Sequence, residues 1–169
     1  MRMLAAAAMA LTSLFAGAAQ AEPVSDAAFR FSVTFPVQSG RETFADPEQS
    51  IRRAVEYEAW DDDAYFVATV AQFGPSDDWA WNDIGGVFRD ARSECVTSND
   101  VVQDRAISIS GGLGAEVLSR RSSRLSSDQV YDLSRVVVRV NKMYCVRATY
   151  RDQADAAAAQ RFVRSFSVY

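Results

Sequence analysis

The sequence QVYDLSRVVVRVNKMYCVRATY, residues 129–150, decides the fold that we expect for this chain. Residues 129–140 form a long run in which alternate valines mark one buried face, as in a β-strand. Asn141-Lys142 is the expected turn, and residues 143–150 return in the opposite direction. The pattern therefore predicts a long antiparallel β-hairpin.

A helix is expected directly after this hairpin. Asp152 is a suitable N-cap because its carboxylate can accept hydrogen bonds from backbone N–H groups of the first turn. Residues 153–166 then carry a partly apolar stripe that includes Phe162, Val163 and Phe166. Such a helix can bury its stripe against an antiparallel sheet.

The first half of the chain predicts three strands. Residues 29–36 alternate strictly between apolar and polar side chains, and residues 54–60 and 64–73 form a hairpin across Asp61-Asp62-Asp63. Residues 37–50 are polar and rich in turn-forming types, so they predict a long loop.

A second helix is expected after the Gly74-Pro75 break, with Ser76 as its N-cap and apolar residues at helical spacing as far as Cys95. Gly85-Gly86 could delay its start. Short strands at 106–110 and 115–121 then lead to the long hairpin. The order β-β-β-α-β-β-β-β-α predicts an α+β fold, with helices packed on the face or faces of an antiparallel sheet.

The first 21 residues have the pattern of a secretory signal peptide. Arg2 is followed by an apolar stretch from residue 4 to residue 18 and by the cleavage pattern Ala19-Gln20-Ala21. The apolar stretch is shorter than the roughly 20 residues that a spanning helix needs. We expect cleavage between Ala21 and Glu22, a periplasmic or secreted protein without a membrane span, and a single α+β domain over residues 22–169.

The composition excludes several kinds of chemistry. The chain has no histidine, so it cannot use a Ser-His-Asp or Cys-His mechanism or an imidazole metal ligand. Lys142 is its only lysine and lies in no glycine-rich phosphate motif. The formal net charge of −4 argues against nucleic acid and anionic membrane surfaces as partners.

Cys95 and Cys145 are the only cysteines, and an exported chain meets conditions in which disulfides form. A bond between them would close a loop of about 51 residues and contribute about 4 kcal/mol in the chain-entropy model. The alternative is two separately buried thiols. We expect the disulfide.

Several segments together resemble those of a known family. They are Phe31-Ser32-Val33-Thr34-Phe35-Pro36, Ile107-Ser108-Ile109, the glycine turn from Gly111 to Glu116, Met143-Tyr144-Cys145-Val146, and Arg161-Phe162-Val163-Arg164-Ser165-Phe166. In this order they resemble small exported bacterial proteins of the PsbP-like superfamily. The resemblance implies an α/β/α sandwich around an antiparallel sheet and, by analogy of fold, a role in binding rather than catalysis.

Acidic residues and tryptophans are concentrated in the segment 60–83. Carboxylates of this segment could hold Ca²⁺, although their spacing does not match an EF-hand; they are Asp61, Asp62, Asp63, Asp77 and Asp78. The alternative is that they form a solvated turn and a negatively charged helix N-terminus. Trp60, Trp79 and Trp81 could form a platform for a sugar or a peptide, or could be buried in the core. Otherwise we expect no cofactor.

Arginines Arg120, Arg121 and Arg124, interspersed with serines, predict a basic loop. The loop could bind an anionic ligand or an acidic partner surface, or could simply face the acidic half of the chain. The function that these observations favour is a non-enzymatic periplasmic accessory or binding protein, whose partner is another envelope protein or a small ligand. The alternative is a carboxylate-based hydrolase that acts on glycans of the cell envelope.

Overall fold

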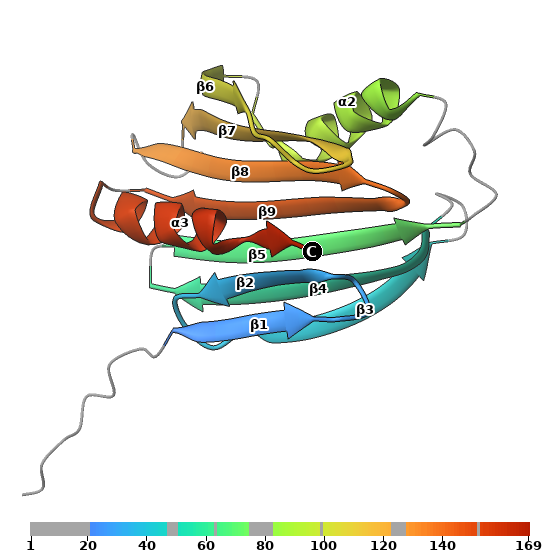
Figure 1. The fold of residues 1–169 in the computed structure, drawn as a ribbon. Helices are drawn as coiled ribbons and strands as arrows, with labels where there is room; N and C mark the ends of the chain where they lie inside the picture. Colours follow the sequence, from blue (N-terminus) through green and yellow to red (C-terminus); the bar gives the residue numbers. More distant parts are fainter. Residues whose placement is uncertain are drawn as a thin grey trace, which may run out of the picture.

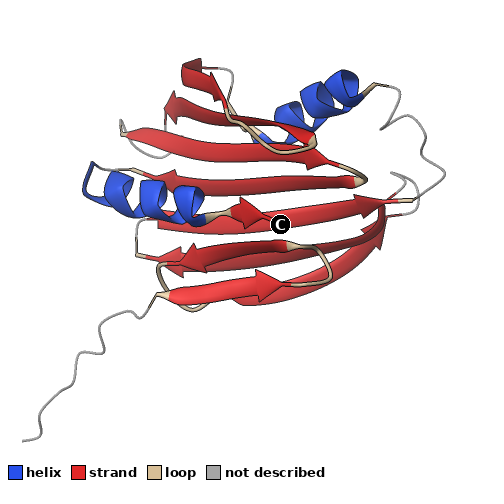
Figure 2. Cartoon of the chain, in the orientation of Figure 1, coloured by secondary structure: helices blue, strands red, loops and turns tan. Residues whose placement is uncertain are grey.

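A computed structural model describes residues 21–46, 51–62, 64–74, 83–98, 100–122, 128–151 and 153–169. It contains two antiparallel sheets and two helices (Figures 1 and 2). The strands and helices in chain order are β1 (Glu22–Asp26), β2 (Phe31–Phe35), β3 (Gly40–Asp46), β4 (Ile51–Asp61), β5 (Ala64–Phe73), α2 (Ile84–Cys95), β6 (Asp100–Ala106), β7 (Gly112–Ser122), β8 (Gln129–Arg139), β9 (Lys142–Tyr150), α3 (Gln153–Ser165) and β10 (Ser167–Val168).

The larger sheet has seven strands in the order β3-β4-β5-β9-β8-β7-β6, and every neighbouring pair is antiparallel. The predicted hairpins are confirmed as β4–β5 and β8–β9. The second turn lies one residue earlier than expected, at Val140-Asn141, where Val140 has a φ of 54°.

One face of the large sheet is covered by α3 and by the small sheet, in which β2 lies between β1 and β10. Figure 1 shows both in front of the seven strands. Their apolar side chains form the main core: Phe31, Val33 and Phe35 of β2 and Phe162 and Val163 of α3 pack against Phe66, Val137, Tyr144 and Val146 of the large sheet. The covering layer on this face is thus a helix beside a small sheet, rather than helices alone.

On the opposite face, α2 packs over part of the sheet. Val87, Ala91 and Cys95 of α2 contact Val136 and Val138 of β8 in a second, smaller cluster. The helix begins at Ile84, before the paired glycines, and its N-cap is Asp83, whose side chain accepts a hydrogen bond from the N–H of Gly86. The expected N-cap, Ser76, lies outside the described residues.

Several expectations about strands are wrong. The predicted loop at residues 37–50 contains β3, which is held by its pairing with β4. β6 ends at Ala106, and Ile107-Ser108-Ile109 lies outside it. A Cβ atom on Gly114 would meet the side chains of Ile107 and Ile109 at 2.7 and 2.9 Å, so these isoleucines pack directly over β7 instead of continuing a strand.

β7 begins earlier than expected, at Gly112, and Gly111 provides the turn before it with a φ of 69°. The short strands β1 and β10 were not predicted. Both pair with β2, which lies far from β10 in the sequence. The predicted helix at residues 153–166 is confirmed as α3, whereas its expected N-cap, Asp152, lies outside the described residues.

A buried carboxylate joins strands on the side of the sheet that carries α3. Glu116 of β7 is 5% exposed. It accepts hydrogen bonds from Arg135 at 2.7 Å and from Arg105 at 2.5 Å, and Arg164 of α3 lies 3.9 Å away. Burial raises the pKa of Glu116, but the hydrogen bonds and charges of Arg135 and Arg105 outweigh it, so the pKa lies below its ordinary value.

Replacing this carboxylate should therefore destabilise the fold. We expect Glu116→Gln to lower the free energy of unfolding at neutral pH by about 2 kcal/mol, less than for a fully buried pair because Arg105 and Arg164 stay half exposed. Urea unfolding measures this difference.

The stabilisation by Glu116 should also depend on pH. Because the pKa of Glu116 is lower in the folded protein than in the unfolded chain, the stabilisation is present above the ordinary pKa of a glutamate. It is lost as the pH falls through the pKa of Glu116 in the folded protein. If the difference in free energy of unfolding between wild type and Glu116→Gln stays constant on acidification, the stabilising role of the ionised Glu116 carboxylate is contradicted.

Candidate functional site

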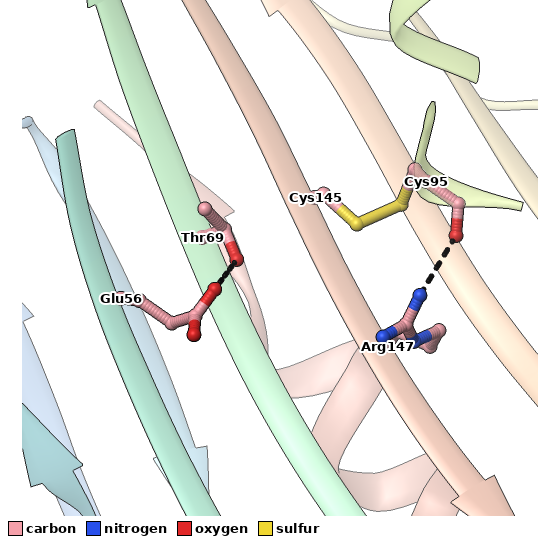
Figure 3. Close-up of a disulfide and its surroundings, with 5 residues drawn as sticks. All are labelled: Glu56, Thr69, Cys95, Cys145 and Arg147. Atoms are coloured by element: carbon pink, nitrogen blue, oxygen red, sulfur yellow. Dashed lines mark hydrogen bonds between the residues drawn. A yellow bond between two sulfur atoms is a disulfide. The ribbon is translucent and has the colours of Figure 1, made fainter. Parts of the chain in front are cut away.

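The face that carries α2 is covered only in part, and an open groove lies between the end of this helix and strands β4, β5 and β9. Its volume is about 320 Å³. It is lined by Glu56, Tyr65, Val67, Thr69, Glu94, Cys95, Met143, Cys145 and Arg147. Figure 3 shows five of these residues. We call this surface the α2 groove.

The register of the strands brings the lining residues together. Glu56, Thr69 and Cys145 occupy one row across β4, β5 and β9, and Val67 and Arg147 stand side by side in the next row. Because neighbouring residues of a strand point to opposite faces, the groove residues alternate along these strands with residues of the other face. Val55, Ala68 and Val146 of that other face belong to the main core.

Hydrogen bonds hold the acidic side chains of the groove in place. Thr69 donates through Oγ1 to Glu56 at 2.7 Å, and the Tyr65 hydroxyl donates to Glu58 at 3.0 Å. Burial raises the pKa of Tyr65 to about 12, with further contributions from the hydrogen bond to Glu58 and from the charges of Glu58 and Glu56. The charges of Glu58 and Glu56 thus act on Tyr65 together, and the charge of Arg147 opposes them.

Arg147 supports the C-terminal end of α2. Its Nη1 donates to the carbonyl oxygen of Cys95 at 3.5 Å, next to the disulfide that joins the helix to β9 (Figure 3). A cation is favourable there because the last carbonyls of a helix carry partial negative charge. Glu94 lies exposed in the same last turn. The positive charge of Arg147 thus faces the helix end, while three carboxylates border the groove.

The predicted disulfide between Cys95 and Cys145 is confirmed. The two Cα atoms are 5.7 Å apart, and the residues are 50 positions apart in the chain. The bond fastens the last turn of α2 to the central part of the sheet. Both cysteines also line the α2 groove.

The loop after α2 is fastened through a buried carboxylate on the same face. Asp132 of β8 is 1% exposed. It accepts hydrogen bonds from Thr97 at 3.0 Å and from Thr149 at 2.5 Å, and Arg121 Nε lies 3.4 Å away. These contacts hold the backbone directly after Cys95 against the sheet.

Trp60 extends this surface beyond the groove. It is 70% exposed, and its ring lies 4.2 Å from that of Tyr65, its partner in the β4–β5 pair. The two rings are tilted by 34° to each other, and such an exposed aromatic pair offers an apolar contact area beside charged groups. The other two tryptophans of interest, Trp79 and Trp81, lie outside the described residues.

The predicted acidic site is described only in part. Asp61 and Asp62 lie exposed at the tip of the β4–β5 hairpin, where Asp62 has a φ of 36°. Asp63, Asp77 and Asp78 lie outside the described residues. Within the part of the chain that the structure describes, no three acidic or cysteine side chains are grouped closely enough to hold a metal ion.

Arg120 and Arg121 lie in strand β7 and not in the predicted loop. Because they are adjacent in a strand, they point to opposite faces, and each has an acidic partner: Asp100 at 2.7 Å for Arg120 and Asp132 at 3.4 Å for Arg121. Arg124 lies outside the described residues. The role of these arginines in binding stays a prediction.

Sequence reasoning did not single out Glu56, Glu58, Thr69 or Arg147 as site residues. The alternation of Glu56, Glu58 and Trp60 with Val55, Tyr57 and Ala59 does indicate a strand with one polar, half-exposed face. From that alternation, the sequence could have predicted that one face of β4 is not covered by the rest of the protein. It could not reveal which other strands lie beside it.

Comparison with known proteins supports a fold but not a function. No protein-family model matches the sequence, and no curated protein matches it. The solution structure of cyanobacterial PsbP from Synechocystis is 12% identical, with a TM-score of 0.52, and the match covers 92% of this chain and 96% of that one. The fold of the chain is therefore PsbP-like.

Two further solved structures are similar at lower scores. One is a crystal structure from Bacteroides thetaiotaomicron, with 12% identity, a TM-score of 0.46 and coverage of 83% of this chain. Since only 45% of that chain is covered, the present chain spans about half its length. The other is a Pseudomonas aeruginosa protein of unknown function, with 9% identity, a TM-score of 0.39 and coverage of 83% and 88%.

The disulfide should contribute strongly to stability because it closes a long loop. We expect the double variant Cys95→Ala/Cys145→Ala to lower the free energy of unfolding by about 4 kcal/mol in the chain-entropy model. Urea unfolding under non-reducing conditions measures the loss. Adding a reductant should destabilise the wild type by a similar amount and leave the double variant unchanged; equal responses of the two proteins would argue against this role.

Proposed function

We propose that this chain is a non-enzymatic accessory protein of the cell envelope, and that it binds a basic segment of another envelope protein in the α2 groove. The observation that carries the proposal is the groove itself. Among the described residues, Glu56 and Glu94 line it and Glu58 accepts a hydrogen bond from Tyr65 of its lining, whereas the cation that lines it, Arg147, faces the end of α2. A lysine or arginine of a partner would complement this excess of negative charge.

Three features support a location outside the cytoplasm. The first residues have the pattern of a secretory signal, a disulfide suits an oxidising compartment, and β1 begins at Glu22, directly after the expected cleavage site. The side chain of Glu22 accepts hydrogen bonds from the N–H and hydroxyl of Ser39 at 2.6 and 2.9 Å. None of the described helices has the length and apolar character needed to cross a bilayer.

A binding role accounts for the groove better than catalysis does. The chain has no histidine for proton transfer. Asp61 and Asp62 lie at an exposed hairpin tip rather than facing each other across a cleft, as a pair of glycosidase carboxylates must. The PsbP-like fold adds support by analogy only.

Export can be tested directly. We expect the protein recovered from the periplasm or medium of the source organism to begin at Glu22, as measured by N-terminal sequencing or intact mass. The variant Ala21→Pro should block cleavage, because signal peptidases require a small, accessible residue there. Recovery of wild-type protein only from the cytoplasm, with residues 1–21 attached, would contradict the proposal.

Partner binding can be tested with a photo-crosslinking amino acid at Thr69, in the middle of the groove, in cells of the source organism. We expect a discrete crosslinked protein that carries an exposed basic segment. A probe at Gln160, which is exposed on α3, is the control for position and should give no such product.

Charge variants then test the mechanism of binding. Glu56→Gln/Glu58→Gln should reduce the crosslink by about tenfold, since each lost charge pair is worth about 1 kcal/mol or less at an exposed site and two are removed. Asp100→Asn removes one negative charge at the far edge of the sheet and should leave the yield unchanged. An equal yield from both probes, or from all of these variants, would contradict the assignment of the groove.

A further inference from the structure

Four cationic side chains gather at the end of the large sheet where β8 turns into β9, on the right of Figure 1. They are Arg30, Arg53, Arg139 and Lys142, which we call the cationic cluster. Arg139 and Lys142 are directly opposite each other in the β8–β9 pair. Like charges at such positions destabilise a sheet.

The strand register shows that the cluster lies on one face. Gln72 of β5 pairs with Arg53 on one side and with Lys142 on the other. Arg53 donates through Nε to the Gln72 side chain at 2.8 Å, so these two side chains lie together. Arg30 approaches from the short segment between β1 and β2.

The charge of the cluster is not balanced by the carboxylates that the structure describes. Ion pairs among the described residues involve seven arginines, and none of these four cations takes part. Burial lowers the pKa of Lys142, and the charges of Arg30, Arg53 and Arg139 lower it further. Among the residues that the structure describes, positive charge is therefore concentrated at a point where no carboxylate forms an ion pair with it.

One guanidinium of the cluster is also held in place. Arg53 donates through Nη2 to the carbonyl of Ala28 at 3.2 Å, and its guanidinium lies 4.8 Å from the centre of the Phe29 ring. A cation fixed in this way loses little entropy when an anion binds. The backbone of Arg30 is fixed as well: it adopts a φ of 62°, in the left-handed region, and its N–H donates to the carbonyl of Asp26 at 2.7 Å.

We propose that the cationic cluster binds a phosphate group. Guanidinium groups suit phosphate because their paired N–H donors match two of its oxygens, and the lysine adds a compact charge to those of the three arginines. A doubly charged anion would offset the repulsion between Arg139 and Lys142. Free phosphate and the phosphate of a lipid headgroup share this chemistry.

This site is independent of the α2 groove. Lys142 shares its face with Tyr144 and the main core, whereas Cys145 and Arg147 of the same strand face the groove. A failure of one site to bind its ligand therefore leaves the other untouched.

The test uses inorganic phosphate as the probe, with calorimetric binding and thermal unfolding of the purified protein at low ionic strength. We expect phosphate to bind and to raise the melting temperature more than chloride of equal ionic strength does. Lys142→Met, which keeps the length of the side chain, should weaken binding by about tenfold, as expected for the loss of one charge-assisted contact. Arg139→Gln should do the same.

A matched control variant and a second measurement distinguish a loss of phosphate binding from a loss of folding. Arg89→Gln removes one positive charge from the exposed side of α2 and should leave phosphate binding unchanged. Without phosphate, Lys142→Met should raise the melting temperature, because it removes like-charge repulsion, whereas a merely damaged fold would lower it. A response to phosphate no greater than to chloride, or equal losses in Arg89→Gln and Lys142→Met, would overturn the proposal.

Vesicles distinguish the two sources of phosphate. Binding to vesicles that contain phosphatidic acid, but not to vesicles of phosphatidylcholine alone, would identify a lipid headgroup, provided that Lys142→Met weakens it as it weakens the binding of inorganic phosphate. Binding to inorganic phosphate without binding to either vesicle would identify a free phosphate or a small phosphate ester. Because both sources carry the same phosphate group, failure to bind inorganic phosphate overturns the proposal whichever vesicles bind.

Discussion

The two-residue alternation of β9 is the constraint on which the rest of the structure depends. This strand lies in the middle of the seven-stranded sheet, between β5 and β8. Tyr144, Val146 and Ala148 point into the core beneath α3 and the small sheet, so Cys145 and Arg147 must point to the other face. A shift of one residue in register would exchange these two sets and bury Arg147 in an apolar core.

The same alternation separates two surfaces of opposite charge. The α2 groove is acidic and is bounded by a helix that the disulfide and Arg147 hold against the sheet. The cationic cluster lies on the face of the main core, at the β8–β9 turn. The chain has a formal net charge of −4, and its described residues separate an acidic groove from a cationic cluster. Each proposed ligand is opposite in charge to the surface that would bind it.

Prediction from the sequence succeeded where the signal is local. The β8–β9 hairpin, the β4–β5 hairpin and α3 each show a regular period over ten residues or more, and the structure contains all three. Prediction failed where an element depends on a distant partner. β3 is a polar segment that becomes a strand because β4 offers it a free edge, and β10 is a two-residue strand that exists only beside β2. Ile107-Ser108-Ile109 has the pattern of a strand, but its side chains pack over Gly114 instead.

The sequence by itself determined the α+β class, the alternating faces of the strands and the presence of two cysteines in a chain with an export pattern. These properties follow from side-chain periodicity and composition, which need no knowledge of neighbours. Only the tertiary structure decided that Glu56, Thr69 and Arg147 share a groove and that Arg30, Arg53 and Lys142 share a cluster. Strand order and register set these neighbours, and both result from the packing of the whole core rather than from any one segment.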